Sequence, residues 1–174
     1  MKKSLVSLAA GFLVAGTVFA SAADKVVLHI GNAVISAYRT SDLEGAKAQA
    51  AAEHKPIAWI ASASRLLNET GSIARPDGRG AAFHAFYALR SRTVLVFEDA
   101  YAENHKVLPL VDKALHTPDP HYTPPKVIFL NPELTEVLAT VEYEPDVTKR
   151  AQALASALNQ AEAKMKAEAT TSGK

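Results

Sequence analysis

Three short apolar runs place the strongest constraint on how this chain can fold. They are IAWIA at residues 57–61, TVLVF at 93–97 and KVIFL at 126–130. Periodicity alone cannot separate a buried strand from a buried helical turn in runs of this length. Their shortness and their polar, Gly- and Pro-containing neighbours favour buried strands. The segments between them have helical patterns, so the chain is expected to alternate strands with helices.

The segments before the first run predict a strand and then a helix. VVLHI at residues 26–30 is typical of a short strand, and a less regular stretch is expected after it, up to Thr40. Ser41 and Glu44 have the spacing of a capping box, which predicts that a helix begins here. The alanine-rich body of this helix is expected to end before Pro56, which cannot continue it.

Later segments predict three more helices, two loops and a hairpin. Helical spacing is found at residues 81–90 and 107–115, and an amphipathic helix is expected from about Asp146. Residues 68–80 are rich in Gly, Asn, Asp and Pro and predict a long loop, while four prolines in residues 116–125 predict a stiff, irregular loop. KVIFL and EVLATVEYE flank the turn signal NPELT, which indicates an antiparallel hairpin.

The N-terminus has the features of a secretory signal peptide. Two lysines precede an apolar stretch of about fourteen residues, and Ala20-Ser21-Ala22 is a small-x-small cleavage site. We therefore expect a signal peptide at residues 1–22 and a periplasmic or secreted protein. The mature chain is expected to hold an N-terminal strand and lead-in at 23–40, a single domain at 41–166 and a flexible tail at 167–174.

Charge and cysteine content exclude several classes of function. Loss of Lys2 and Lys3 with the signal peptide changes 19 basic residues to 17, against 18 acidic ones. A nearly neutral mature chain without a long basic run argues against binding to nucleic acid or to an anionic membrane surface. The chain has no cysteine. Thiol catalysis, iron–sulfur clusters and cysteine-rich zinc sites are therefore excluded.

Two stretches resemble the thioredoxin-like fold superfamily. KPIAWIASAS at residues 55–64 is similar to the lysine-proline-strand segment that leads into the family's active site. YTPPKVIFLNPELTEVLATVEYEP at 122–145 resembles its cis-proline loop, hairpin and return strand. The resemblance covers about residues 41–160 and agrees with the predicted order of elements. It implies an α/β fold, with a central mixed sheet, flanking helices and a C-terminal β-hairpin plus helix.

The resemblance identifies a member without the CxxC redox motif. It places Ser64 and Leu67 where the two cysteines would stand, and Pro125 at the cis-proline position. A serine hydroxyl cannot form the mixed disulfide of thiol–disulfide exchange. The family pattern implies a binding groove between the helix start at 62–67 and the proline loop at 121–125. Its residues would be Ser64, Arg65, Leu67, Thr123, Pro124 and Pro125. Ser64 as a simple helix cap and Pro125 in a trans turn are the alternatives.

Two classes of function are left open by these observations. In the first, the groove holds an extended peptide or a partner protein, without enzymatic activity. In the second, His116, Asp119 and His121 bind zinc or copper and support metal-dependent chemistry. The alternative is that these residues are surface histidines beside a turn-forming aspartate, which would have the same sequence pattern without binding a metal. The sequence indicates no other cofactor, and it does not give the ligand or the oligomeric state.

Other polar residues are expected to have structural roles. Glu98 and Asp99 follow the run TVLVF and predict an exposed acidic strand end. His84 lies within the helical segment FHAFY and is expected to be structural or solvated. Trp59 is expected in the core.

Overall fold

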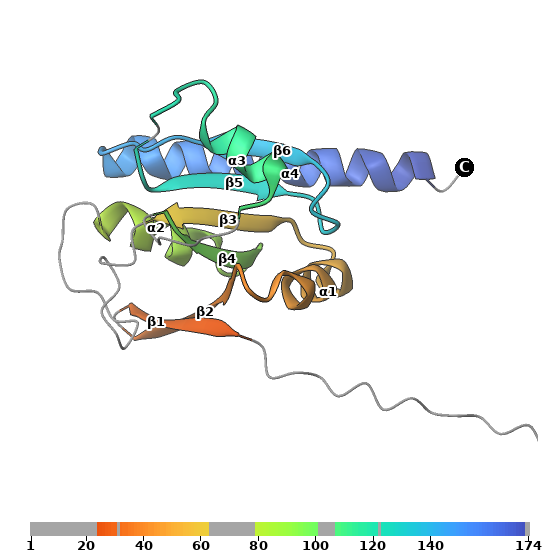
Figure 1. Ribbon diagram of the computed structural model, residues 1–174, viewed down its shortest axis with the longest axis horizontal. Helices are drawn as coiled ribbons and strands as arrows, with labels where there is room; N and C mark the ends of the chain where they lie inside the picture. Colours follow the sequence, from red (N-terminus) through yellow and green to blue (C-terminus); the bar gives the residue numbers. More distant parts are fainter. Residues whose placement is uncertain (1–23, 31, 63–78, 101–106, 122, 173–174) are drawn as a thin grey trace, which may run out of the picture.

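The computed structural model describes residues 24–30, 32–62, 79–100, 107–121 and 123–172 of the chain. These residues form six strands and four helices (Figure 1). In chain order the elements are β1 (Lys25–Ile30), β2 (Ala33–Arg39), α1 (Leu43–Glu53), β3 (Ile57–Ser62), α2 (Arg79–Leu89), β4 (Val94–Asp99), α3 (Pro109–Leu115), β5 (Lys126–Leu130), β6 (Val137–Val141) and α4 (Val147–Ser172).

The six strands form one mixed sheet in the order β1-β2-β4-β3-β5-β6. β2, β4 and β3 are parallel to one another, whereas β1, β5 and β6 each run antiparallel to their neighbours. The chain passes from β3 to β4 on one side and then crosses to β5 on the other side of β3. β3 therefore lies at the point where the direction of winding changes.

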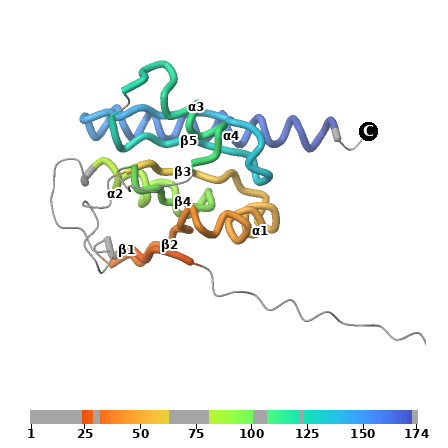
Figure 2. The backbone as a smooth tube through the Cα atoms, in the orientation of Figure 1, coloured from red at the N-terminus to blue at the C-terminus, as the bar shows by residue number. Residues whose placement is uncertain are grey.

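Helices cover both faces of the sheet and enclose two apolar cores (Figures 1 and 2). Ala58 and Ile60 of β3 belong to the core on the α2 and α4 face. Ile57, Trp59 and Ala61, which point the other way, pack on the α1 and α3 face. Because both faces are covered, every residue of β3 is buried, and this explains the continuous apolar run. The predicted α/β, thioredoxin-like architecture with a C-terminal hairpin and helix is confirmed.

The segment after the first strand is more regular than the sequence predicts. Residues 33–39 form β2, which pairs with β1 along its length and with β4 at its end. Its burial alternates from Ala33 to Ala37, but the exposed position 34 is occupied by an apolar valine, 65% exposed, so the sequence itself does not show the alternation. The hairpin of β1 and β2 therefore extends the sheet, where a separate lead-in was expected.

The predicted capping box at Ser41 and Glu44 is wrong. The N-cap of α1 is Asp42, whose carboxylate accepts a hydrogen bond from the Gly45 amide at 3.1 Å. The Ser41 hydroxyl instead donates to the carboxylate of Asp24. Asp24 lies next to β1, so a contact distant in sequence takes the serine from the helix and leaves the next residue to cap it.

Two element boundaries differ from those expected. α4 continues to Ser172, through most of the segment 167–174 that was expected to be a flexible tail. α2 begins at Arg79, inside the predicted loop 68–80, whose residues 68–78 lie outside the described part of the chain. The predicted signal peptide also lies outside it. Among the described helices, none is long and apolar enough to span a membrane.

Candidate functional site

The carboxyl end of β3 is the position in this sheet best suited to binding. In open α/β sheets, ligands bind beyond the carboxyl ends of strands, at the point where the winding changes direction. β3 ends at Ser62, and its last described pair with β5 joins Ala61 to Lys126. Extending this antiparallel register by one residue places Ser62 opposite Pro125. The end of β3 and the proline loop are therefore neighbours, as the resemblance implies.

The proline loop, residues 121–125, becomes progressively more buried towards β5. The Pro124–Pro125 peptide bond is cis, in agreement with the family pattern, and the Thr117–Pro118 bond is cis as well. Pro125 is buried, Pro124 is partly buried and Thr123 is exposed. Of the six predicted groove residues, these three are described. Ser64, Arg65 and Leu67 lie outside the described residues.

A fully buried lysine fixes the loop to the sheet. The Lys126 ammonium group donates to the backbone carbonyls of Leu115 at 2.9 Å and Thr117 at 2.8 Å. It also lies 2.7 Å from a carboxylate oxygen of Glu142, whose side chain is about half exposed (47%). The three contacts tie the end of α3, the first part of the loop and the segment after β6 to the first residue of β5. Lysine is rarely buried unless it is paired in this way.

A buried glutamate lies on the same face of the sheet as Lys126. Ala61 pairs with Glu98 on one side and with Lys126 on the other, so the three residues form one row across β4, β3 and β5. Glu98 is 1% exposed, and the predicted exposed strand end is wrong at this residue. The indole Nε1 of Trp59 donates to the Glu98 carboxylate. Trp59 reaches Glu98 from the neighbouring strand, which explains how a carboxylate is accommodated under α1 and α3.

Ser62 is the last residue of β3 and is also buried, at 2% exposure. Its hydroxyl has no hydrogen-bond partner within the described part of the chain. Buried hydroxyl groups usually have a partner, so one without is unusual. The buried hydroxyl group of Ser62 is therefore a polar group at the end of β3, where the candidate site is expected.

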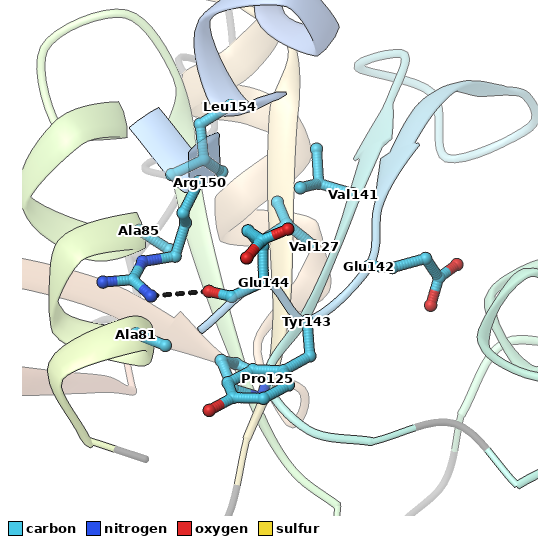
Figure 3. A pocket seen from close by; sticks show the side chains of 10 residues that line it. All are labelled: Ala81, Ala85, Pro125, Val127, Val141, Glu142, Tyr143, Glu144, Arg150 and Leu154. Carbon is cyan, nitrogen blue, oxygen red and sulfur yellow. Dashed lines mark hydrogen bonds between the residues drawn. The ribbon is translucent and has the colours of Figure 1, made fainter. Parts of the chain in front are cut away.

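A small cavity lies behind Pro125, between α2, β5, β6 and α4 (Figure 3). Its volume is about 10 Å³, which is enough for one water molecule at most. Arg150 closes one side, where its guanidinium group donates to the Glu144 carbonyl at 2.6 Å, as the dashed line in Figure 3 shows. An organic ligand does not fit behind the proline loop, so binding at this site must occur on its outer surface.

Arg150 also determines the environment of His84. Its Nε donates to Nδ1 of the histidine at 3.2 Å. Burial, and secondly the positive charge of Arg150, hold the pKa of His84 below its ordinary value. The histidine is therefore a partly buried acceptor that links α2 to α4, which agrees with a structural role.

The predicted metal ligands do not come together as a site. His116, Asp119 and His121 are all exposed. Nδ1 of His116 contacts the carbonyl of Asp112 at 2.9 Å, and the Asp119 carboxylate accepts the His121 amide at 2.8 Å, as in a turn. Within the described residues, no group of three or more His, Cys, Asp or Glu side chains could hold a metal ion.

Comparisons with known proteins add little to this geometry. No protein-family model matches the sequence, and no curated protein matches it. A solved structure described as DsbH oxidoreductase is similar over 70% of this chain and 85% of its own, with 18% sequence identity and a TM-score of 0.38. A TM-score at that level is low. The assignment of the fold rests on the order and pairing of the strands.

Proposed function

We propose that this protein is an exported, redox-inactive binding module. In this proposal, an extended segment of a peptide or partner protein binds on the surface formed by Thr123, Pro124 and Pro125, beside the carboxyl end of β3. The thioredoxin-like fold supplies the position, and the absence of cysteine excludes disulfide exchange there.

The anchoring of the proline loop by Lys126 is the observation that carries the proposal. A recognition loop binds best when its bound conformation is fixed in advance, because less conformational freedom is lost on binding. The contacts of the buried ammonium group with the Leu115 and Thr117 carbonyls join the start of residues 115–126 to their end at Lys126, and the contact with Glu142 joins them to the segment after β6. The exposed Thr123 is thus presented from a rigid support.

Backbone recognition agrees with the position of this loop. Described pairing between β3 and β5 stops at Ala61 and Lys126, so residues 123–125 lie beyond the last pair. Pro124 and Pro125 have no backbone N–H, so this part of the loop would contribute backbone carbonyl groups, together with the amide and carbonyl of Thr123, to hydrogen bonds with an added extended segment. The 10 Å³ volume behind Pro125 favours a ligand that lies across the surface over one that enters the fold.

A permanently unfolded, cysteine-alkylated polypeptide is a suitable probe of this proposal. Binding of the labelled probe is measured by fluorescence anisotropy with the wild-type chain and with Thr123→Trp. The control is Thr140→Trp, which places the same side chain on an exposed position of β6. We expect saturable binding that is weakened at least about tenfold by Thr123→Trp only. Absence of binding, or equal binding by both variants, would contradict the proposal.

A further inference from the structure

β2 and β4 are unpaired along part of their length, at the end of the sheet opposite the proline loop. β2 and β4 are paired only through Tyr38 with Val96 and Arg39 with Phe97. The preceding residues of β2 pair with β1, and Val94 and Leu95 pair with β3, but the two strands do not pair with each other there. The facing edges of β2 and β4 therefore open into a gap that contains unpaired backbone positions.

An open cavity of about 200 Å³ occupies this gap. Residues from β1, β2, α1, the turn between α2 and β4, and the start of β4 surround it. They are Lys25, Val34, Ile35, Ser36, Tyr38, Gln49, Arg90, Thr93, Val94 and Leu95. The volume is several times the roughly 30 Å³ share of one water molecule, but it is below the roughly 300 Å³ at which sites for drug-sized ligands begin. Its size suits a small polar molecule.

The charged side chains around the cavity favour a negatively charged ligand. Two cations, Lys25 and Arg90, belong to the lining, and none of the described lining residues is Asp or Glu. Hydroxyl and amide groups of Ser36, Gln49 and Thr93 add polar character. A carboxylate or phosphate group is the chemistry that such a combination recognises, because ammonium and guanidinium groups form charge-assisted hydrogen bonds with anionic oxygens.

Both cations are held in place by aromatic rings. The Lys25 ammonium lies 4.0 Å from the centre of the Tyr38 ring and 3.3 Å from the Gln49 side-chain oxygen. The Arg90 guanidinium carbon lies 3.6 Å from the centre of the Tyr87 ring, and one N–H donates to the Tyr87 carbonyl. Rings that hold the cations reduce the loss of side-chain freedom on binding.

We propose that the gap between β2 and β4 is a binding site for a small organic anion that bears a carboxylate or phosphate group. Lys25 and Arg90 bind its anionic oxygens, and the edges of Ser36 and Leu95 contact the rest of the molecule. The site lies at the amino end of β4, whereas the proposed peptide surface lies at the carboxyl end of β3. The two proposals are therefore independent, and either can fail alone.

Titration with succinate and with glycerol phosphate, followed by ¹H–¹⁵N NMR, tests this site. Sodium chloride at equal ionic strength and uncharged glycerol are the controls. We expect saturable shifts of the amides of Ser36, Thr93 and Leu95 with at least one of the two anions, and none that saturate with either control. Lys25→Gln and Arg90→Gln should each weaken binding about tenfold or more, as removal of a charge-assisted hydrogen bond does. The matched control Lys47→Gln, at a partly exposed position of α1 outside the cavity lining, should leave it unchanged.

A third variant tests whether the ligand needs the volume of the cavity, and it leaves the charged residues unchanged. Ser36→Phe fills the gap while Lys25 and Arg90 remain, and we expect it to abolish the saturable shifts. Circular dichroism confirms that each variant is folded. The proposal is overturned if neither anion gives saturable shifts, if sodium chloride reproduces them, or if Lys47→Gln weakens binding as much as Arg90→Gln.

Discussion

The Lys126 ammonium group lies 2.7 Å from the Glu142 carboxylate, although the lysine side chain is fully buried and the glutamate side chain is about half exposed. The ion pair therefore extends from the interior of the α3 face to solvent. The same ammonium group satisfies the carbonyls of Leu115 and Thr117. Lys126 is thus the central support of the proline loop in this account.

Replacement of Lys126 by methionine should destabilise the protein. The methionine fills most of the space of the lysine stem, but the Leu115 and Thr117 carbonyls lose their donor. We expect the free energy of unfolding to fall by about 1–3 kcal/mol, the usual cost of an unsatisfied buried polar group. Urea denaturation measures it, with Lys113→Met on the exposed side of α3 as the control. An unchanged midpoint for Lys126→Met would show that the anchor has no stabilising effect.

Glu98 should stabilise the core through Trp59. In Glu98→Ala the indole N–H loses its acceptor within a buried region, so we expect a loss of about 1–3 kcal/mol. Glu98→Gln retains an oxygen that can accept this hydrogen bond and should cost less. Because Trp59 is the only tryptophan, its fluorescence reports both the local contact and unfolding in urea. Equal stability of the alanine variant and the wild type would contradict this role.

His84 should make stability depend on pH. Since its pKa in the folded state is lowered, the unfolded chain binds a proton more readily than the folded chain does. Stability should therefore decrease as the pH falls from about 6.5, the ordinary histidine value, through the lower folded pKa. His84→Gln should reduce this slope. Denaturant midpoints between pH 8 and pH 5 measure it, and an identical slope in His84→Gln would refute the assignment.

Glu168 at the end of α4 should be a site of mild repulsion. A hydrogen bond to the Glu136 side chain and the nearby charges of Glu136 and Glu133 raise its pKa. The folded state therefore holds this proton more tightly, and the associated stabilisation is lost as the pH rises through the folded pKa. Glu168→Gln should raise the Tm at pH 7 relative to the wild type, by an amount that shrinks at pH 4. A lower Tm for the variant at pH 7 would contradict the repulsion.

The sequence predicts elements of this fold that depend on local patterns. Apolar runs such as residues 57–61 identify their strands because both faces of the central sheet are covered. The turn NPELT identifies the hairpin of β5 and β6. β2 was missed because apolar and polar residues do not alternate in AVISAYR, where the apolar Val34 is exposed beside the buried Ile35. α1 is capped by Asp42 because Asp24 contacts Ser41.

The polar groups beside the candidate site depend on contacts that are distant in sequence. Glu98 contacts Trp59, 39 positions away in the sequence, and Lys126 contacts Thr117 across a loop that contains two cis-prolines. One signal was present: Glu98 follows Val94 and Val96 at strand spacing, which places it on their buried face. The sequence does not show which partner would satisfy such a group, so its burial could not be predicted from the strand pattern alone.

Site-specific photo-crosslinking in the protein's own compartment tests the central claim most directly. A photoreactive amino acid replaces Thr123 in the proline loop, and in a matched chain it replaces Thr140 on β6. The account predicts discrete crosslinked products from position 123 and none of these products from position 140. The yield of the products from position 123 should be lower in the Lys126→Met variant. Absence of products at 123, or the same products from both positions, would contradict a binding surface at the proline loop.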